Sequence, residues 1–173
     1  MPSTVDLSIS LHAGWTWISF NLEAADMSVA AVFARVTKPF AAPDSIKDQF
    51  DFAMHYAGFG FYGGLATVTT DTMYKINKGA AATFTVTGSP VALPKAFMFY
   101  TGWNYVPCAY QTPTAVGKVF GSASLTSGDV IKSQMKFTTY YVGFGWFGEL
   151  GTVSPGEGYK MRLASGGAAS FPA

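Results

Sequence analysis

Hydrophobic and polar residues alternate along several short segments, which is the pattern of strands with one buried face. The first segment places Leu7, Ile9 and Leu11 on one side and polar residues between them. Residues 44–56 continue the alternation for longer, and one face would hold Ile46, Phe50, Phe52, Met54 and Tyr56. We predict one long strand here, with Lys47 and Gln49 on its outward face.

Two segments have helical spacing instead. Val29, Val32, Phe33 and Val36 recur at intervals of three and four behind Asp26 and Ser28, which can cap a helix. Residues 115–120 have a similar apolar face behind Thr114. We expect one helix of about two turns at each place.

The whole pattern occurs twice. Residues 56–65 read Tyr-Ala-Gly-Phe-Gly-Phe-Tyr-Gly-Gly-Leu, and about 85 residues later 141–150 read Tyr-Val-Gly-Phe-Gly-Trp-Phe-Gly-Glu-Leu. We therefore expect an all-β fold with one short helix and about five short strands per repeat. Repeat 1 (residues 1–90) and repeat 2 (91–173) would pack about a pseudo-twofold axis into one compact body, as a sandwich or barrel-like structure.

Composition narrows the classes of partner. Of 173 residues 49% are hydrophobic and 12% charged, and the net charge of +1 comes without any basic run, so we expect no nucleic acid partner. No segment reaches the roughly 18 apolar residues of a spanning helix, so we expect no membrane insertion. The single Cys108 excludes an intrachain disulfide. We expect any targeting segment to be missing from this chain.

The repeat also provides a test for catalytic groups, because a site used in both copies would need matched polar residues. Asp44 and Asp129 are the only matched carboxylates, so a paired acid and base has no repeated basis. His12 and His55 are unmatched and have no third ligand at metal spacing. We expect no enzyme, metal or cofactor; an enzymatic alternative would use His55, Asp51 and Asp48.

Matched lysines and glutamines lie near the repeated aromatic turns. They could simply form a solvated sheet face beside core aromatics, or they could form a polar groove with flat rings that suits sugar hydroxyls and ring faces. At least one ring of each adjacent aromatic pair must face outward. The candidate ligand-binding residues are Phe61, Tyr62, Trp146, Phe147, Lys47, Gln49, Lys132, Gln134, Lys75 and Lys160.

Four motifs carry a resemblance to a known group of proteins. They are Gly-Trp-x-Trp-Ile-Ser-Phe-Asn, Asp-x-Ile-Lys-x-Gln, Gly-Phe-Gly-Trp-Phe-Gly-x-Leu-x-Thr-Val and Pro-Gly-x-Gly-Tyr-Lys. Together they resemble a tandem repeat of large, mostly uncharacterised proteins of diatoms and other marine microbes, over nearly the whole chain. Repeat 1 departs from the motif at Phe61 and at residues 70–72. The resemblance implies a secreted or surface-bound module that binds, adheres or builds structure.

Two functions are compatible with these features. The first is a non-catalytic module of an extracellular or cell-surface protein, which binds a polysaccharide or glycoprotein or mediates adhesion through its duplicated aromatic turns. Two equivalent sites would add avidity. The alternative is a structural unit whose partners are copies of itself, self-assembling into a layer, shell or filament.

Overall fold

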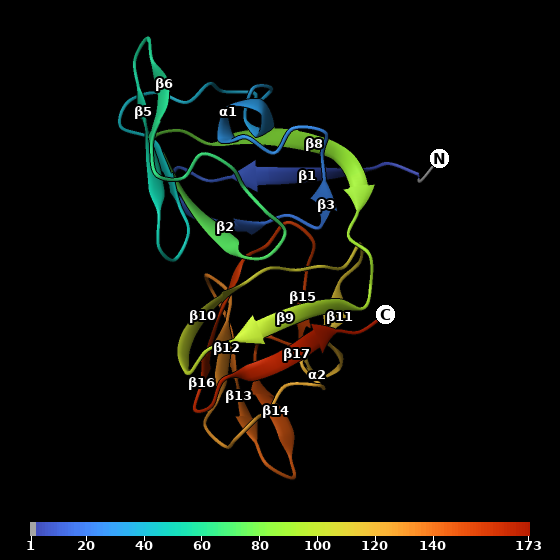
Figure 1. Ribbon diagram of the computed structural model, residues 1–173. Coiled ribbons are helices and arrows are strands. Elements are labelled where there is room, and N and C mark those ends of the chain that lie inside the picture. Colours follow the sequence, from blue (N-terminus) through green and yellow to red (C-terminus); the bar gives the residue numbers. More distant parts are fainter. Residues whose placement is uncertain (1–2) are drawn as a thin grey trace.

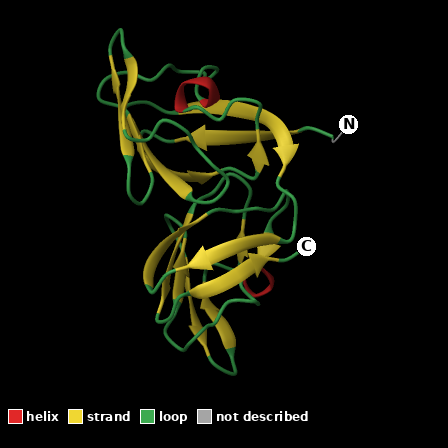
Figure 2. Cartoon of the chain, viewed as in Figure 1, coloured by secondary structure: helices red, strands yellow, loops and turns green. Residues whose placement is uncertain are grey.

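The computed structural model describes residues 3–173, and most of its regular structure is β-strand (Figure 2). The strand pairs are antiparallel. Helices α1 (Val29–Val32) and α2 (Val116–Val119) have four residues each. The expected mainly β fold with short helices is confirmed, and in the described residues 3–173 no sheet closes on itself.

The N-terminal half, residues 3–90, contains two sheets (Figure 1). The smaller has the order β1 (Val5–Leu11), β8 (Ala82–Pro90) and β3 (Leu22–Glu23). The larger has the order β2 (Gly14–Ser19), β7 (Met73–Lys78), β4 (Ser45–Lys47), β5 (Phe52–Tyr56) and β6 (Gly60–Gly63).

The C-terminal half, residues 91–173, also contains a five-stranded sheet. Its order is β10 (Gly102–Val106), β16 (Tyr159–Leu163), β12 (Val130–Lys132), β13 (Phe137–Tyr141) and β14 (Gly145–Gly148). The C-terminal half also has two separate two-stranded sheets. They are β9 (Lys95–Phe99) with β17 (Gly167–Phe171), and β11 (Thr114–Ala115) with β15 (Thr152–Val153). Figure 1 shows the halves stacked, with hairpins β5–β6 and β13–β14 at opposite ends.

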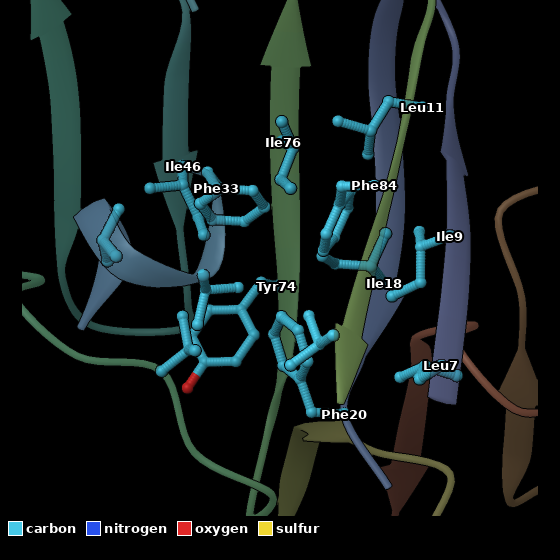
Figure 3. Close-up of a cluster of buried hydrophobic side chains, with 14 of the residues drawn as sticks. Leu7, Ile9, Leu11, Ile18, Phe20, Phe33, Ile46, Tyr74, Ile76 and Phe84 are labelled. Atoms are coloured by element: carbon cyan, nitrogen blue, oxygen red, sulfur yellow. The ribbon is translucent and has the colours of Figure 1, made fainter. Parts of the chain in front are cut away.

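Each half encloses its own hydrophobic cluster. In the N-terminal half Ile9 and Phe84 of the small sheet face Ile18, Ile46 and Ile76 of the large sheet (Figure 3). The C-terminal cluster has its own large side chains, which are Phe99, Phe120, Ile131, Met161 and Phe171. The alternation that predicts a buried face in β1 is confirmed, since Leu7, Ile9 and Leu11 are all buried.

A glycine corner separates the two sheets at the start of each half. Gly14 and Gly102 have φ of 90° and 92°, a conformation that favours glycine. Thr16 Oγ1 accepts a hydrogen bond from His12 N at 2.9 Å, and Asn104 Oδ1 accepts one from Tyr100 N at 2.8 Å. These bonds fix the direction in which the next strand, β2 or β10, leaves the corner.

The single long strand predicted over residues 44–56 is wrong. Asp48 N–H donates to the carbonyl of Asp51, and the Asp48 carboxylate accepts from Phe50 N and Asp51 N, so the chain turns. The result is a β4–β5 hairpin in which Ile46 is buried but Phe52 and Tyr56 face solvent. The turn between β12 and β13 is closed in a similar way by Ser133.

The helices and strands differ from expectation in length and number. Ser28 caps α1 as predicted, but the helix ends at Val32 and the chain then turns to pair Thr37 N with Thr83 O. Thr114 is no cap: it belongs to β11 and donates to the carbonyl of Thr112. The halves contain eight and nine strands rather than five, because turns break the longer alternating segments.

Candidate functional site

The outer face of each five-stranded sheet, turned away from the core, carries aromatic rings beside paired lysines. In the N-terminal sheet neighbouring strands place side by side Trp17, Lys75, Lys47 and Phe52. In the C-terminal sheet the corresponding row is Tyr105, Lys160, Lys132 and Phe137. Both rows run across four strands, with the two lysines in the middle.

A second row adds exposed rings to each face. Trp15 of β2 and Tyr62 of β6 lie at its two ends in the N-terminal sheet, and Trp103 of β10 and Phe147 of β14 lie at the ends in the C-terminal sheet. Tyr62 is 69% exposed and Phe147 55% exposed. We call these two surfaces the aromatic–lysine faces. The N-terminal face consists of Trp15, Trp17, Lys47, Phe52, Tyr62 and Lys75. The C-terminal face consists of Trp103, Tyr105, Lys132, Phe137, Phe147 and Lys160.

The adjacent aromatics of each turn point in opposite directions. Phe61 packs inward against Phe40, with ring centroids 4.9 Å apart, and Trp146 lies 6.3 Å from Phe120. Tyr62 and Phe147 face outward. The expectation that one ring of each pair reaches the surface is confirmed, and of the four turn residues proposed as ligand contacts only Tyr62 and Phe147 lie on the aromatic–lysine faces.

The two proposed glutamines are engaged in holding the two sheets together. Gln134 Oε1 accepts from Trp17 N at 3.1 Å and its Nε2 donates to the carbonyl of Trp15 at 2.6 Å. Gln49 does the same for β10, accepting from Tyr105 N at 3.1 Å and donating to the carbonyl of Trp103 at 2.8 Å. Each side-chain amide thus pairs with the main-chain N–H and C=O groups of an edge strand in the other half. We call these two arrangements the glutamine clasps, and each also protects the edge of the sheet that it contacts.

The glutamine clasps bring the lysines of both faces to one place. Around the Trp17 ring lie the ammonium groups of Lys75, Lys160 and Lys132, at 4.8, 5.1 and 5.7 Å from its centroid. The Tyr105 ring lies 5.4 Å from Lys75 and 5.2 Å from Lys160. Lys47 lies 5.4 Å from the Trp15 ring. We call Lys47, Lys75, Lys132 and Lys160 the lysine cluster.

A cleft of about 510 Å³ opens beside the junction of the two halves. Its walls include Ser10, His12 and Trp17 from the N-terminal half and Gln134, Lys136 and Glu149 from the C-terminal half. A smaller hollow of about 390 Å³ surrounds the β4–β5 turn, next to Lys47 and Phe52. Both hollows adjoin the aromatic–lysine faces, so a ligand there would meet rings, hydroxyl groups and ammonium groups together.

Two residues of the enzymatic alternative, Asp48 and Asp51, lie in one turn, and His55 lies further along β5. The His55 ring packs inward, 5.2 Å from Phe61, whereas Asp48 uses its carboxylate to close the β4–β5 turn. Among residues 3–173 no group of three His, Cys, Asp or Glu side chains is arranged to hold a metal ion. Nor does that part of the chain contain a helix long and apolar enough to cross a membrane.

Sequence reasoning missed four rings of the aromatic–lysine faces. Trp15, Trp17 and Tyr105 lie under lysines, and Trp103 lies under Arg162. The signal was present in Gly-Trp-x-Trp, because alternate residues of a strand share a face. Phe52 was missed because the prediction of one long strand placed it on the same face as the buried Ile46. No known family model, curated protein or solved structure matches this chain.

Proposed function

We propose that the chain is a non-catalytic module of an extracellular or cell-surface protein, which binds glycans through its two aromatic–lysine faces. The observation that carries the proposal is the same on both sheets. A row with a lysine pair at its centre ends in one exposed ring, Phe52 or Phe137, and a neighbouring row has exposed rings at both of its ends. Tyr62 and Phe147 are the outermost rings of the two faces.

The chemistry of the faces fits a saccharide. A sugar ring presents C–H groups to an aromatic surface and hydroxyl groups around its edge. The exposed rings Trp15, Phe52 and Tyr62 supply flat apolar area, and the ammonium groups of Lys47 and Lys75 supply donors. Exposed aromatic patches of this extent mark contact sites on soluble proteins.

We further propose that the halves are two copies of one unit related by a pseudo-twofold axis, with 1–90 and 91–173 forming one compact body. Matching strands support this: β4 and β12 have the same alternation of burial, as do β5 and β13, and β6 and β14. The reciprocal glutamine clasps support it as well. Two faces on one body would bind a repetitive polymer with avidity.

A fluorescence titration with a panel of marine and plant polysaccharides tests the glycan proposal. Tyr62→Ala and Phe147→Ala should each weaken binding about tenfold, equivalent to about 1.4 kcal/mol, while the fold is retained because both rings are exposed. Trp146→Ala would be a poor probe, since its ring packs against Phe120 and Tyr140 and its loss would also destabilise the half.

Tyr100→Ala is the matched control, because Tyr100 is also an exposed aromatic residue but lies outside both faces. It should leave the affinity unchanged. The proposal fails if no polysaccharide of the panel binds the folded protein, or if Tyr100→Ala weakens binding as much as the face variants do.

Self-assembly remains a second proposal because one observation favours it. The tips of the turns expose large apolar side chains, among them Phe50, Phe59, Met135 and Phe144, and Phe59 and Phe144 are 80% and 79% exposed. Such tips are sticky surfaces that a second copy could cover. Elution volumes on gel filtration should then depend on concentration, and Phe59→Ser with Phe144→Ser should abolish the dependence; a monomer at all concentrations would rule this function out.

A further inference from the structure

The lysine cluster is a concentration of like charge that the fold itself assembles. Lys47 lies directly opposite Lys75 on neighbouring strands, and Lys132 lies directly opposite Lys160. Like charges in such cross-strand positions destabilise a sheet. The junction then brings both pairs together, since Lys75 and Lys160 lie over the same two rings.

No carboxylate compensates this charge. Within residues 3–173 the ion pairs are Lys78 with Asp44 and Lys95 with Asp71, and neither includes a member of the cluster. The rings of Trp17 and Tyr105 provide only partial compensation through cation–π contacts. All four lysines are half-buried, so water screens them less than it screens lysines on an open surface.

The electrostatic strain is visible at Lys160. Partial burial is the main cause that lowers the pKa of its ammonium group, and the hydrogen-bonding contact with the Lys75 side chain lowers it next. The charges of Lys75 and Lys47 lower it further, whereas Tyr105 acts in the opposite direction.

We propose that the lysine cluster is an oxyanion-binding site, built by both halves, which takes a sulfate ester or carboxylate of an acidic polysaccharide. Lys75 and Lys160 would donate to the anion from the two sheets, and Lys47 and Lys132 would contribute charge from the neighbouring strands. Trp17 and Tyr105 would hold the ammonium groups in place through cation–π contacts. The inference rests on the proposed glycan function for the identity of the polymer, but the anion site itself stands on the charge geometry.

Dextran sulfate, neutral dextran and inorganic sulfate are the probes that distinguish the oxyanion site from the general glycan function. Wild-type protein should bind dextran sulfate more tightly than neutral dextran, by about tenfold or more. The variant Lys75→Gln with Lys160→Gln should lose this preference. The matched control is Lys38→Gln with Lys118→Gln, which removes the same net charge from two exposed lysines outside the cluster and should keep the preference.

Thermal unfolding provides a second measurement that does not depend on any polymer. At equal ionic strength, millimolar sodium sulfate should raise the Tm of the wild type above its value in sodium chloride, and the cluster variant should show no such difference. Without sulfate the cluster variant should melt no lower than the wild type, because its change removes repulsion.

The outcomes distinguish the two proposals. A sulfate effect on Tm without binding of any polysaccharide would support the oxyanion site, with a free anion as its source, and would reject the glycan function. Binding of neutral dextran equal to that of dextran sulfate would keep the glycan function and overturn the oxyanion site. Equal losses in the cluster and control variants would also overturn the site, because net charge alone would then explain binding.

Discussion

Each half uses one buried aspartate, Asp44 or Asp129, in the same structural role, but a different residue lies beside it. Asp44 accepts from the main-chain N–H groups of Ala41 and Gly79 at 3.0 and 2.8 Å. Asp129 accepts from those of Thr126 and Ala164, both at 2.8 Å. Both carboxylates are buried, at 5% and 3% exposure, and each ties the loop before a central strand to the end of its neighbour.

The difference lies in the residue beside each carboxylate. Lys78, paired with Gly14, donates to Asp44 Oδ2 at 3.2 Å and to the carbonyl of Pro39 at 2.9 Å. Leu163 is paired with Gly102 in the same manner and is equally buried. The shared role of the aspartate is therefore to accept two main-chain hydrogen bonds, and the ion pair is an addition that only the N-terminal half has.

The largest effect that follows from this comparison is expected for Asp44→Ala. It would leave the buried Lys78 ammonium without its counter-charge and should cost about 3–5 kcal/mol of unfolding free energy. Asp129→Ala leaves two unpaired N–H groups but no charge, and should cost about 2 kcal/mol. Equilibrium unfolding in urea measures both; equal losses would show that the lysine adds nothing.

Lys78→Leu is the next test, because it converts the N-terminal arrangement into the C-terminal one. The change removes the two hydrogen bonds that the Lys78 ammonium donates, to Asp44 and to the carbonyl of Pro39. It leaves the two main-chain N–H groups that donate to Asp44, so a loss of about 1.5–3 kcal/mol is expected. Leu163→Met serves as the control for packing at the equivalent site. A loss as large as that of Asp44→Ala would contradict the view that the main-chain bonds are sufficient.

The two glutamine clasps have the same geometry, so equivalent variants of them should lose similar amounts of stability. Gln49→Ala and Gln134→Ala each remove one donor and one acceptor from an exposed clasp, so each should cost about 1 kcal/mol. Gln134→Glu keeps the acceptor for Trp17 N and should lose about half of that. Near-ultraviolet circular dichroism should report both clasps, because each holds an aromatic edge strand; a change confined to one of the two variants would show that the junction is asymmetric.

The smallest expected effect is the loss of stability at acidic pH. Burial raises the pKa of Asp44, but hydrogen bonds from Ala41 and Gly79 and the pairing with Lys78 outweigh it, so the net shift is downward. The stabilisation is therefore present above the unfolded pKa of about 3.9 and is lost as the pH falls through the lower folded value. The stability gap between wild type and Asp44→Asn should narrow between about pH 5 and pH 2; a constant gap would show that Asp44 does not titrate in this way.

The strands with plain alternation could be read from sequence, and the turns inside longer segments could not. Leu7, Ile9 and Leu11 predict β1 because polar residues separate them without interruption. In the segment 44–56 the large hydrophobic residues stay at even-numbered positions before and after the turn. The hydrophobic periodicity therefore did not reveal that the chain reverses at Asp48. Local side-chain bonding of this kind competes with strand pairing and leaves no mark in a hydrophobic pattern.

The candidate site shows the same limit at the level of side chains. Comparison of similar sequence segments identified Lys47, Lys75, Lys132 and Lys160, but their convergence depends on how the halves pack. The roles of Gln49 and Gln134 depend on packing as well, since each acts on the opposite sheet. Sequence similarity between segments selected these residues as candidates, and only the tertiary structure shows which groups they contact.

Cys108 is a buried residue, and its position at the junction of the halves makes it a useful reporter of their separation. Its N–H donates to Ser19 Oγ of the other half at 2.9 Å, and burial raises the pKa of its thiol to about 12. A thiol reagent can therefore reach it only when the segment leaves Ser19 or the whole chain unfolds. Comparing labelling rates with unfolding rates would measure how often the halves part while each remains folded.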